Sequence, residues 1–163
     1  MIANPGWVNQ CIAHPRVRAY GIAQRDNSGP LVSSPEGLMH TRILIVDDSD
    51  STRGLVREYL ESQPDFEVCG EAVDGWEGIE KGRELKPDLI VLDYSLPRMN
   101  GLKAAVMLHE IVPNTPIILF TFYKDVIPLR MALASGVASV VSKTDQLTLL
   151  ATEVHRLMVG KNN

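Results

Sequence analysis

The feature that most constrains the fold of this chain is a pair of short apolar segments that each end in acidic residues. Residues 42–46 are followed by Asp47 and Asp48, and residues 89–92 are followed by Asp93. Both segments are rich in β-branched residues and nearly free of polar alternation, which is typical of strands buried on both faces of a parallel sheet. Carboxylates are therefore expected at the ends of two buried strands.

The three acids are expected to meet in space, although Asp48 and Asp93 are 45 positions apart in the sequence. In an open α/β sheet the carboxyl ends of the strands form the crevice where ligands bind. Clustered carboxylates repel one another, so either they hold protons at raised pKa values or a cation neutralises them. A hard divalent cation with oxygen ligands is the usual solution.

From Met39 onward, apolar segments alternate with amphipathic stretches of helical length, which is the pattern of repeated strand–helix units. Right-handed crossovers place five such units in a doubly wound α/β fold with a parallel sheet. The expected strands are residues 42–46, 66–72 (at or near a sheet edge), 89–92, 116–121 and 137–141. The expected helices run from a cap at Ser49 or Asp50 to Pro64, from Asp74 to about Lys86, from Gly101 to Val112, from Val126 or Ile127 to Ser135, and from a cap at Asp145 to about Val159.

Composition limits the class of protein. The 163 residues, 45% of them hydrophobic, provide one domain with a real core. Residues 39–163 carry a net charge of −5, which argues against a surface that tracks a nucleic-acid backbone. Two cysteines favour a reducing cytoplasm over a disulfide framework. Neither a membrane span nor a secretory signal is visible, so no membrane partner is expected.

The first 38 residues differ from the rest. Proline, glycine and serine interrupt them, and neither a helical nor a strand period persists. We expect residues 1–38 to be a disordered or loosely attached leader and residues 39–163 to be the folded domain. Because Met39 stands just before the first strand, the sequence leaves two candidate starts of the protein, Met1 and Met39.

Two further polar residues mark strand ends. Thr121 closes the fourth expected strand, and Lys143 follows the fifth. A carboxylate cation site beside a hydroxyl and an ammonium suits phosphoryl transfer, because the charge of that group must be neutralised while a nucleophile lines up. A carboxylate can itself be the nucleophile and form an aspartyl phosphate. In isolation Thr121 would be an ordinary strand residue and Lys143 a solvated charge, and an Asp after a strand often forms a turn or caps a helix.

Four motifs in one order resemble the response regulator receiver domain of two-component signalling. They are Ile-Leu-Ile-Val-Asp47-Asp48-Ser, Leu-Ile-Val-Leu-Asp93-Tyr-Ser-Leu-Pro97-Arg-Met-Asn-Gly101, Ile-Ile-Leu-Phe-Thr121 and Val-Val-Ser-Lys143. The resemblance covers about residues 41–159. It implies a flavodoxin-like fold in which five helices flank a five-stranded parallel sheet of order 2-1-3-4-5. The 18 residues after Asp145 provide one helix, so a single-domain type is expected.

The resemblance also implies roles for the acids. Asp93 would be the phosphoacceptor. Asp48, Asp93 and the backbone carbonyl of Ser95 would bind Mg²⁺, with Asp47 acting from the outer sphere. Asp93-Tyr94-Ser95 lacks the second acid two residues on that a haloacid-dehalogenase-like hydrolase would show, which disfavours a phosphatase that uses Asp as its nucleophile.

Thr121 and Lys143 would bind the phosphoryl oxygens and report their arrival, but two nearby positions depart from the family pattern. Receivers usually carry an aromatic residue three positions before the lysine, where this chain has Val140. The residue after the switch hydroxyl is commonly small, whereas here it is Phe122. We therefore expect an altered switch and restricted access to the phosphoryl group.

The implied function is a phosphorylation-dependent signalling switch. A sensor histidine kinase or phosphotransfer protein would phosphorylate Asp93, and binding of an unknown output protein would then change; a phosphorylation-dependent homodimer is compatible with this scheme. The chain would be a phosphoacceptor that assists its own phosphorylation and dephosphorylation, not a turnover enzyme. The alternative is a receiver-fold interaction module whose switching is lost or independent of phosphate, which Val140 and Phe122 support. Trp76 is expected in the core of its amphipathic helix.

Overall fold

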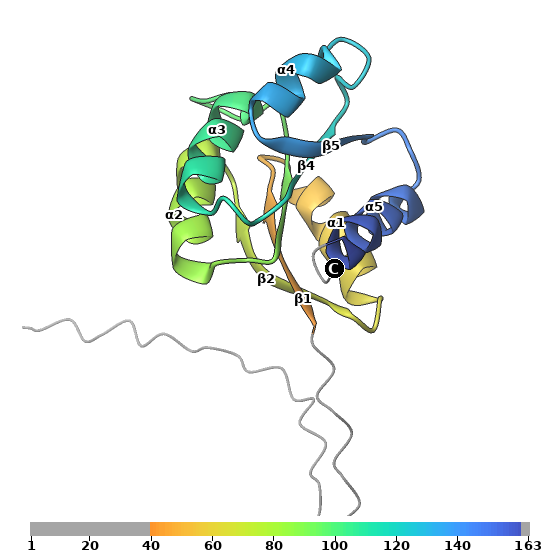
Figure 1. The fold of residues 1–163 in the computed structure, drawn as a ribbon. Helices are drawn as coiled ribbons and strands as arrows, with labels where there is room; N and C mark the ends of the chain where they lie inside the picture. The colour runs from red at the N-terminus through yellow and green to blue at the C-terminus, as the bar shows by residue number, and fades with distance from the viewer. Residues whose placement is uncertain (1–39, 161–163) are drawn as a thin grey trace, which may run out of the picture. The chain divides into compact units, whose positions relative to one another are not determined.

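The computed structural model describes residues 40–160, and the predicted leader lies outside them. Five parallel strands form one sheet in the order β2-β1-β3-β4-β5, and a helix follows each strand (Figure 1). This architecture confirms the predicted doubly wound fold and its strand order. The strands are β1 (Thr41–Val46), β2 (Phe66–Ala72), β3 (Leu89–Leu92), β4 (Ile117–Thr121) and β5 (Val137–Ser142). The helices are α1 (Asp50–Glu61), α2 (Gly75–Leu85), α3 (Gly101–Ile111), α4 (Leu129–Ala134) and α5 (Leu147–Val159).

The sheet is buried on both faces, which explains why its central strands lack polar alternation. Successive side chains of a strand point to opposite faces, so β1 sends Ile43 and Ile45 to one face and Leu44 and Val46 to the other. Helices α1 and α5 cover the first face, and α2 and α3 cover the second (Figure 1). Each of these four β1 residues is at most 1% exposed.

Helix caps stand directly after strand ends and fix the chain there. The Ser49 hydroxyl accepts a hydrogen bond from the Thr52 N–H at 3.3 Å at the start of α1. Asp74 caps α2 by accepting bonds from the N–H groups of Trp76 and Glu77 at 2.9 and 3.0 Å. Each bond satisfies a donor that the first turn of a helix leaves without a partner.

The start of α4 differs from the prediction. The sequence placed it near Val126 or Ile127 with Pro128 in the first turn, but α4 begins at Leu129. Pro128 is extended, with a ψ of 122°, and occupies the N-cap position. A proline disfavours helical geometry in the residue before it, so Ile127 lies outside the helix.

Two smaller expectations were wrong. Asp145 does not cap α5, which begins at Leu147, and its carboxylate instead accepts a bond from the Ser142 N–H at 3.3 Å. Trp76 lies on the surface of α2 with 49% of its area exposed. Among residues 40–160, no helix combines the length and the apolar character needed to cross a membrane.

Candidate functional site

The three acids meet at the carboxyl ends of β1 and β3. These strands are neighbours whose register pairs Val46 with Leu92, so the residues that follow lie side by side. One carboxylate oxygen each from Asp47, Asp48 and Asp93 lies within 4.8 Å of the other two. Asp47 and Asp93 are only 3% and 4% exposed, whereas Asp48 faces solvent. The structure therefore confirms the predicted convergence of the acids.

Lys143 lies among these acids, with its side chain 5% exposed. Its Nζ is 2.6 Å from Oδ2 of Asp47 and 3.0 Å from Oδ2 of Asp93. Its backbone N–H donates to the Thr121 carbonyl at 3.0 Å, which fixes the chain just beyond β5 against the end of β4. A buried ammonium between two buried carboxylates offsets part of their repulsion.

The carboxyl group of Asp47 has a shifted pKa. Burial raises this pKa above its ordinary value, because the low-dielectric surroundings disfavour the charged form. The bond from Lys143 and a bond from the Ser49 N–H to Oδ1, at 2.9 Å, act in the opposite direction. The Asp47 carboxylate is therefore held in its buried position by the Lys143 ammonium and the Ser49 N–H.

The residues at the end of β4 surround Lys143. Thr121 is fully buried, and its hydroxyl accepts a hydrogen bond from the Tyr123 N–H at 3.2 Å. The Phe122 ring is 63% exposed, and its centroid is 5.4 Å from Nζ of Lys143. Val140 of β5 is half-buried against the core. Of the predicted switch residues, Lys143 contacts the acids directly, and Thr121 and Phe122 lie next to Lys143.

The loop after β3 is held rigidly. The Gly101 N–H donates to the Tyr94 carbonyl at 2.8 Å, and a methyl group at Gly101 would overlap the carbonyl oxygen of Asp93. Met99 of the same loop is buried in the core. Ser95 is exposed in this loop, two positions after Asp93, and its carbonyl as a metal ligand stays a prediction.

The donor set of the cluster fits a hard divalent cation. Mg²⁺ takes oxygen ligands at about 2.1 Å, so oxygens on opposite sides of one ion lie about 4 Å apart. The three carboxylate oxygens span no more than 4.8 Å, which is close to this separation. Asp48, being exposed, leaves one side of the cluster open to water. Asp48 and Asp93 could hold Mg²⁺ directly, with Asp47 contributing through the outer sphere.

Two arginines that hold chain segments adjoining the acids were missed from the sequence. Arg53 of α1 has a side chain only 9% exposed, and its Nη1 donates to the Asp47 carbonyl at 2.8 Å. Its position on the same helix face as the buried Val56 and Leu60 was the available signal. Arg98, which has a positive φ of 67°, pairs with the carboxylate of Asp74 and ties the loop after β3 to the start of α2.

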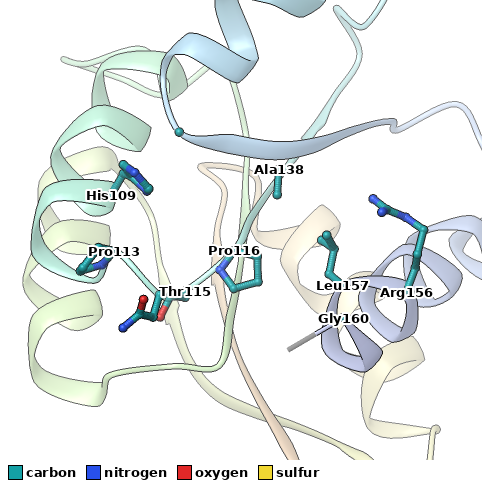
Figure 2. A pocket seen from close by; sticks show the side chains of 10 residues that line it. His109, Pro113, Thr115, Pro116, Ala138, Arg156, Leu157 and Gly160 are labelled. Carbon is teal, nitrogen blue, oxygen red and sulfur yellow. The ribbon is translucent and has the colours of Figure 1, made fainter. Parts of the chain in front are cut away.

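A separate hollow of about 420 Å³ lies at the other end of the sheet (Figure 2). Its lining includes His109 of α3 and Arg156 of α5, with Pro116 and Ala138 from the starts of β4 and β5. None of the three acids lines it. Because the strands are parallel, their amino ends lie opposite the acid cluster, so this hollow is not part of the candidate site.

Comparison with known proteins agrees with this geometry. The family model for the response regulator receiver domain matches residues 43–155. The chain belongs to this family. The receiver domain is 40% identical over 118 residues to a protein-glutamate methylesterase/protein-glutamine glutaminase of Maricaulis maris, and 35% identical over 118 residues to the response regulator protein VraR of Staphylococcus saprophyticus. These alignments cover 71% and 72% of the chain.

A solved structure agrees as well. The response regulator domain of Thermotoga maritima CheB has a TM-score of 0.66 and 30% sequence identity, over 76% of this chain and 98% of that one. The chain spans only 29% of the Maricaulis relative and 56% of VraR. The similarity therefore concerns the receiver domain of two-component response regulators and not the remaining parts of those proteins.

Proposed function

We propose that Asp93 accepts a phosphoryl group and that this receiver domain is a phosphorylation-dependent switch in two-component signalling. The observation that carries the proposal is the place of the Asp93 carboxylate, buried at the end of β3 and 3.0 Å from the ammonium of Lys143. A carboxylate held beside a cation is a competent nucleophile toward phosphorus once the charge of the phosphoryl group is neutralised.

The reaction joins one oxygen of Asp93 to phosphorus. The donor is a phosphohistidine of a sensor histidine kinase or a phosphotransfer protein, and its P–N bond breaks as the new O–P bond forms. The donor imidazole leaves with the electron pair of that bond and takes up a proton. The domain contributes positioning and charge, so it assists its own phosphorylation and dephosphorylation and is not a turnover enzyme.

Mg²⁺ belongs to the proposal. Its ligands would be Asp48, Asp93 and the backbone carbonyl of Ser95, with Asp47 in the outer sphere. When bound, the ion supplies positive charge that offsets the phosphoryl oxygens. Lys143 supplies a further positive charge from the protein itself, since its Nζ already contacts Asp47 and Asp93.

Phosphorylation then changes the contacts of Thr121 and Lys143. The new oxygens attract the hydroxyl and the ammonium through charge-assisted hydrogen bonds. The Thr121 hydroxyl would donate to a phosphoryl oxygen, and because it also accepts the bond from the Tyr123 N–H, a shift of the hydroxyl would move the chain after β4. That response alters binding of an output protein or of a second copy of the domain.

The proposal assigns the folded domain to residues 39–163. We expect the protein to act in the cytoplasm and not to contact nucleic acid directly.

The first test measures the adduct. The full chain with Mg²⁺ and acetyl phosphate should gain one phosphoryl group by intact-mass spectrometry, and Asp93→Asn should gain none. Asp125→Asn changes an exposed aspartate in the β4–α4 connection and is the matched control, which should react as the unaltered chain does. An adduct that survives in Asp93→Asn would place the acceptor elsewhere.

The second test concerns the metal. Mg²⁺ should bind weakly, because two carboxylates and one carbonyl leave several coordination positions to water. Asp48→Ala and Asp93→Ala should each abolish the binding in a titration followed by amide chemical shifts. A titration curve that neither substitution changes would remove the ion from these two residues.

Val140 favours a second candidate, an interaction module whose switching does not depend on phosphate. Without an aromatic ring at this position, the usual rotating side chain is missing. Beryllofluoride, which mimics the phosphoryl group, distinguishes the two candidates. A switch predicts amide shift changes that extend through residues 122–145. Changes confined to the loops around Asp48 and Asp93 would support the interaction module.

A further inference from the structure

We infer that Arg53 is a positioning residue of the acid cluster: it holds the peptide group between Asp47 and Asp48 and so helps to place both carboxylates. The inference rests on the proposed function, because it assigns the role of Arg53 in building that site. Arg53 lies on α1 and contacts the site through the backbone, so it differs from the residues that touch the metal or the phosphoryl group.

The guanidinium of Arg53 donates hydrogen bonds to three different residues. Nη1 donates to the Asp47 carbonyl at 2.8 Å, Nη2 to the Asp50 carboxylate at 2.8 Å, and Nε to the Glu71 carboxylate at 3.2 Å. Asp50 starts α1, Glu71 lies in β2, and Asp47 follows β1. One side chain therefore joins three elements where the strands end. A planar guanidinium presents donors in three directions at once, which a lysine ammonium on its flexible stem does less rigidly.

The bond to Asp47 affects both acids because of peptide geometry. The Asp47 carbonyl and the Asp48 N–H belong to one planar group, so fixing the carbonyl fixes that plane. The preceding peptide is held as well, since the Asp47 N–H donates to the Ala72 carbonyl of β2 at 3.0 Å. With both neighbouring peptides fixed, the backbone of Asp47 has one conformation. The direction of the Asp47 side chain and the position of the Asp48 Cα follow from it.

Burial makes this contact difficult to replace. A buried charge is costly unless it is paired and hydrogen-bonded, and Arg53 meets that condition through Asp50 and Glu71. Asp50 is almost fully exposed, whereas the side chain of Glu71 is 24% exposed, so Glu71 is the stronger anchor. Removing the guanidinium would release the peptide between Asp47 and Asp48. Glu71 would then keep only its ion pair with Arg57.

Arg57 provides a matched control on the same helix. It pairs with the other carboxylate oxygen of Glu71, and its side chain is 49% exposed. Its described polar contact is to Glu71 and not to the Asp47 carbonyl. Arg57→Met thus removes a cation and an ion pair with Glu71, as Arg53→Met does, but leaves the peptide between the acids held.

The experiment uses the full chain and three variants, Arg53→Met, Arg53→Lys and Arg57→Met. Two quantities are measured for each: the Mg²⁺ dissociation constant from amide shifts, and the rate of adduct formation with acetyl phosphate. We expect Arg53→Met to weaken Mg²⁺ binding about tenfold, as loss of a group that orients a ligand does, and to slow the adduct by a similar factor. For Arg53→Lys, both quantities should lie between those of Arg53→Met and the unaltered chain. For Arg57→Met, both should stay near those of the unaltered chain, even if its thermal midpoint drops.

The outcomes separate this inference from the proposed function. Folded Arg53→Met with unchanged Mg²⁺ affinity and rate overturns the inference alone, as does an equal loss in Arg57→Met. If Arg53→Met does not fold, Arg53→Lys decides, and unchanged values there overturn the inference. An unaltered chain that binds no Mg²⁺ and takes no adduct defeats the proposed function. In that case the role of Arg53 is tested without metal, by comparing the amide chemical shifts of Asp47 and Asp48 in the unaltered chain and in Arg53→Lys. If these shifts are the same in both chains, the role of Arg53 is overturned.

Discussion

We expect Phe122 to limit access to Asp93, the proposed phosphoacceptor of this receiver domain. The ring is exposed, yet it stays 5.4 Å from the ammonium of Lys143, a distance at which an aromatic face attracts a cation. Lys143 also contacts Asp93, so we expect the ring to cover one approach to this carboxylate. An aromatic side chain here therefore bears on both the position of the ammonium and the entry of water.

Replacing Phe122 with alanine should shorten the life of the phosphoryl group on Asp93. Water or a phosphatase group would then meet less obstruction, and the ammonium would lose its aromatic contact. The decay rate of the adduct, followed by intact mass after removal of acetyl phosphate, should rise several-fold. Val126→Ala removes another exposed apolar side chain from the same segment and serves as the control, with no change in decay. A decay rate that Phe122→Ala leaves unaltered would mean that the ring shields nothing.

Two elements hold the acceptor loop from either side: the start of α3 through Gly101, and the start of α2 through Asp74. Gly101 allows the helix to approach the Asp93 carbonyl more closely than a side chain permits. Asp74 caps α2 and pairs with Arg98 of the loop. These contacts hold the starts of α3 and α2 against the chain that follows β3.

Gly101→Ala should destabilise the domain by about 1–3 kcal/mol, because the added methyl group overlaps backbone atoms that cannot rotate away. Adduct formation should slow as well, since the Asp93 carbonyl has to move. Gly54→Ala is the matched control within α1, where an added methyl group meets nothing within 4 Å. That change should stabilise the domain by up to about 1 kcal/mol, since alanine is the better helix former. Urea unfolding measures the unfolding free energy of both variants. Equal changes in the two would show that the space around Gly101 is not what makes its substitution costly.

Asp74→Ala should cost about 1 kcal/mol of unfolding free energy at neutral pH through loss of the α2 cap. Asp74→Asn keeps an oxygen that can cap the helix and should cost less. The bond from the Glu77 N–H, followed by the interaction with Arg98, lowers the pKa of Asp74 below its ordinary value.

The pH dependence follows from that direction. The charge of Asp74 contributes fully above the unfolded pKa of about 3.9, and this contribution is lost as the pH falls through the lower folded value. The difference in unfolding free energy between the unaltered chain and Asp74→Ala should therefore become smaller below about pH 4, over the pH range in which both proteins fold. A constant difference down to the lowest such pH would show that the charge of Asp74 adds nothing.

The elements that were predictable from the sequence are those whose signal is local. Burial on both faces identifies β1 and β3, and the Asp74-Gly75 pair identifies the start of α2. The start of α4 was less accessible, because proline suits an N-cap as well as a first turn. The anchoring of Arg53 by Glu71 was not accessible, since it depends on how β2 pairs with β1. The register of that pair shifts between Ile43 and Leu44, and no local pattern predicts such a shift.

At the scale of the whole molecule, the order of the strands separates two groups of site residues. The acids follow β1 and β3, which have a strand neighbour on both sides. Thr121 ends β4, and Lys143 follows β5, which is an edge strand. The acids thus follow strands inside the sheet, and the residues proposed to respond to a phosphoryl group follow strands toward one edge of it.

The predicted leader gives a test on the whole chain. A protein that begins at Met39 should keep the thermal midpoint of the full chain within error, because a segment without periodic apolar residues has few buried contacts to lose. Its adduct rate with acetyl phosphate should also be unchanged. A clear drop in the midpoint would show that residues 1–38 pack on the domain.

The edge position of β5 has a consequence for how such a domain diversifies. Next to it, α4 is a helix of six residues that exposes Leu129, Met131 and Leu133 to solvent. These exposed positions are not among the residues that pair β1 with β3 or that form the acid cluster. A descendant of this protein could therefore acquire a new binding partner through α4 and β5 while it inherits the acid cluster unchanged, and a protein engineer can follow the same route.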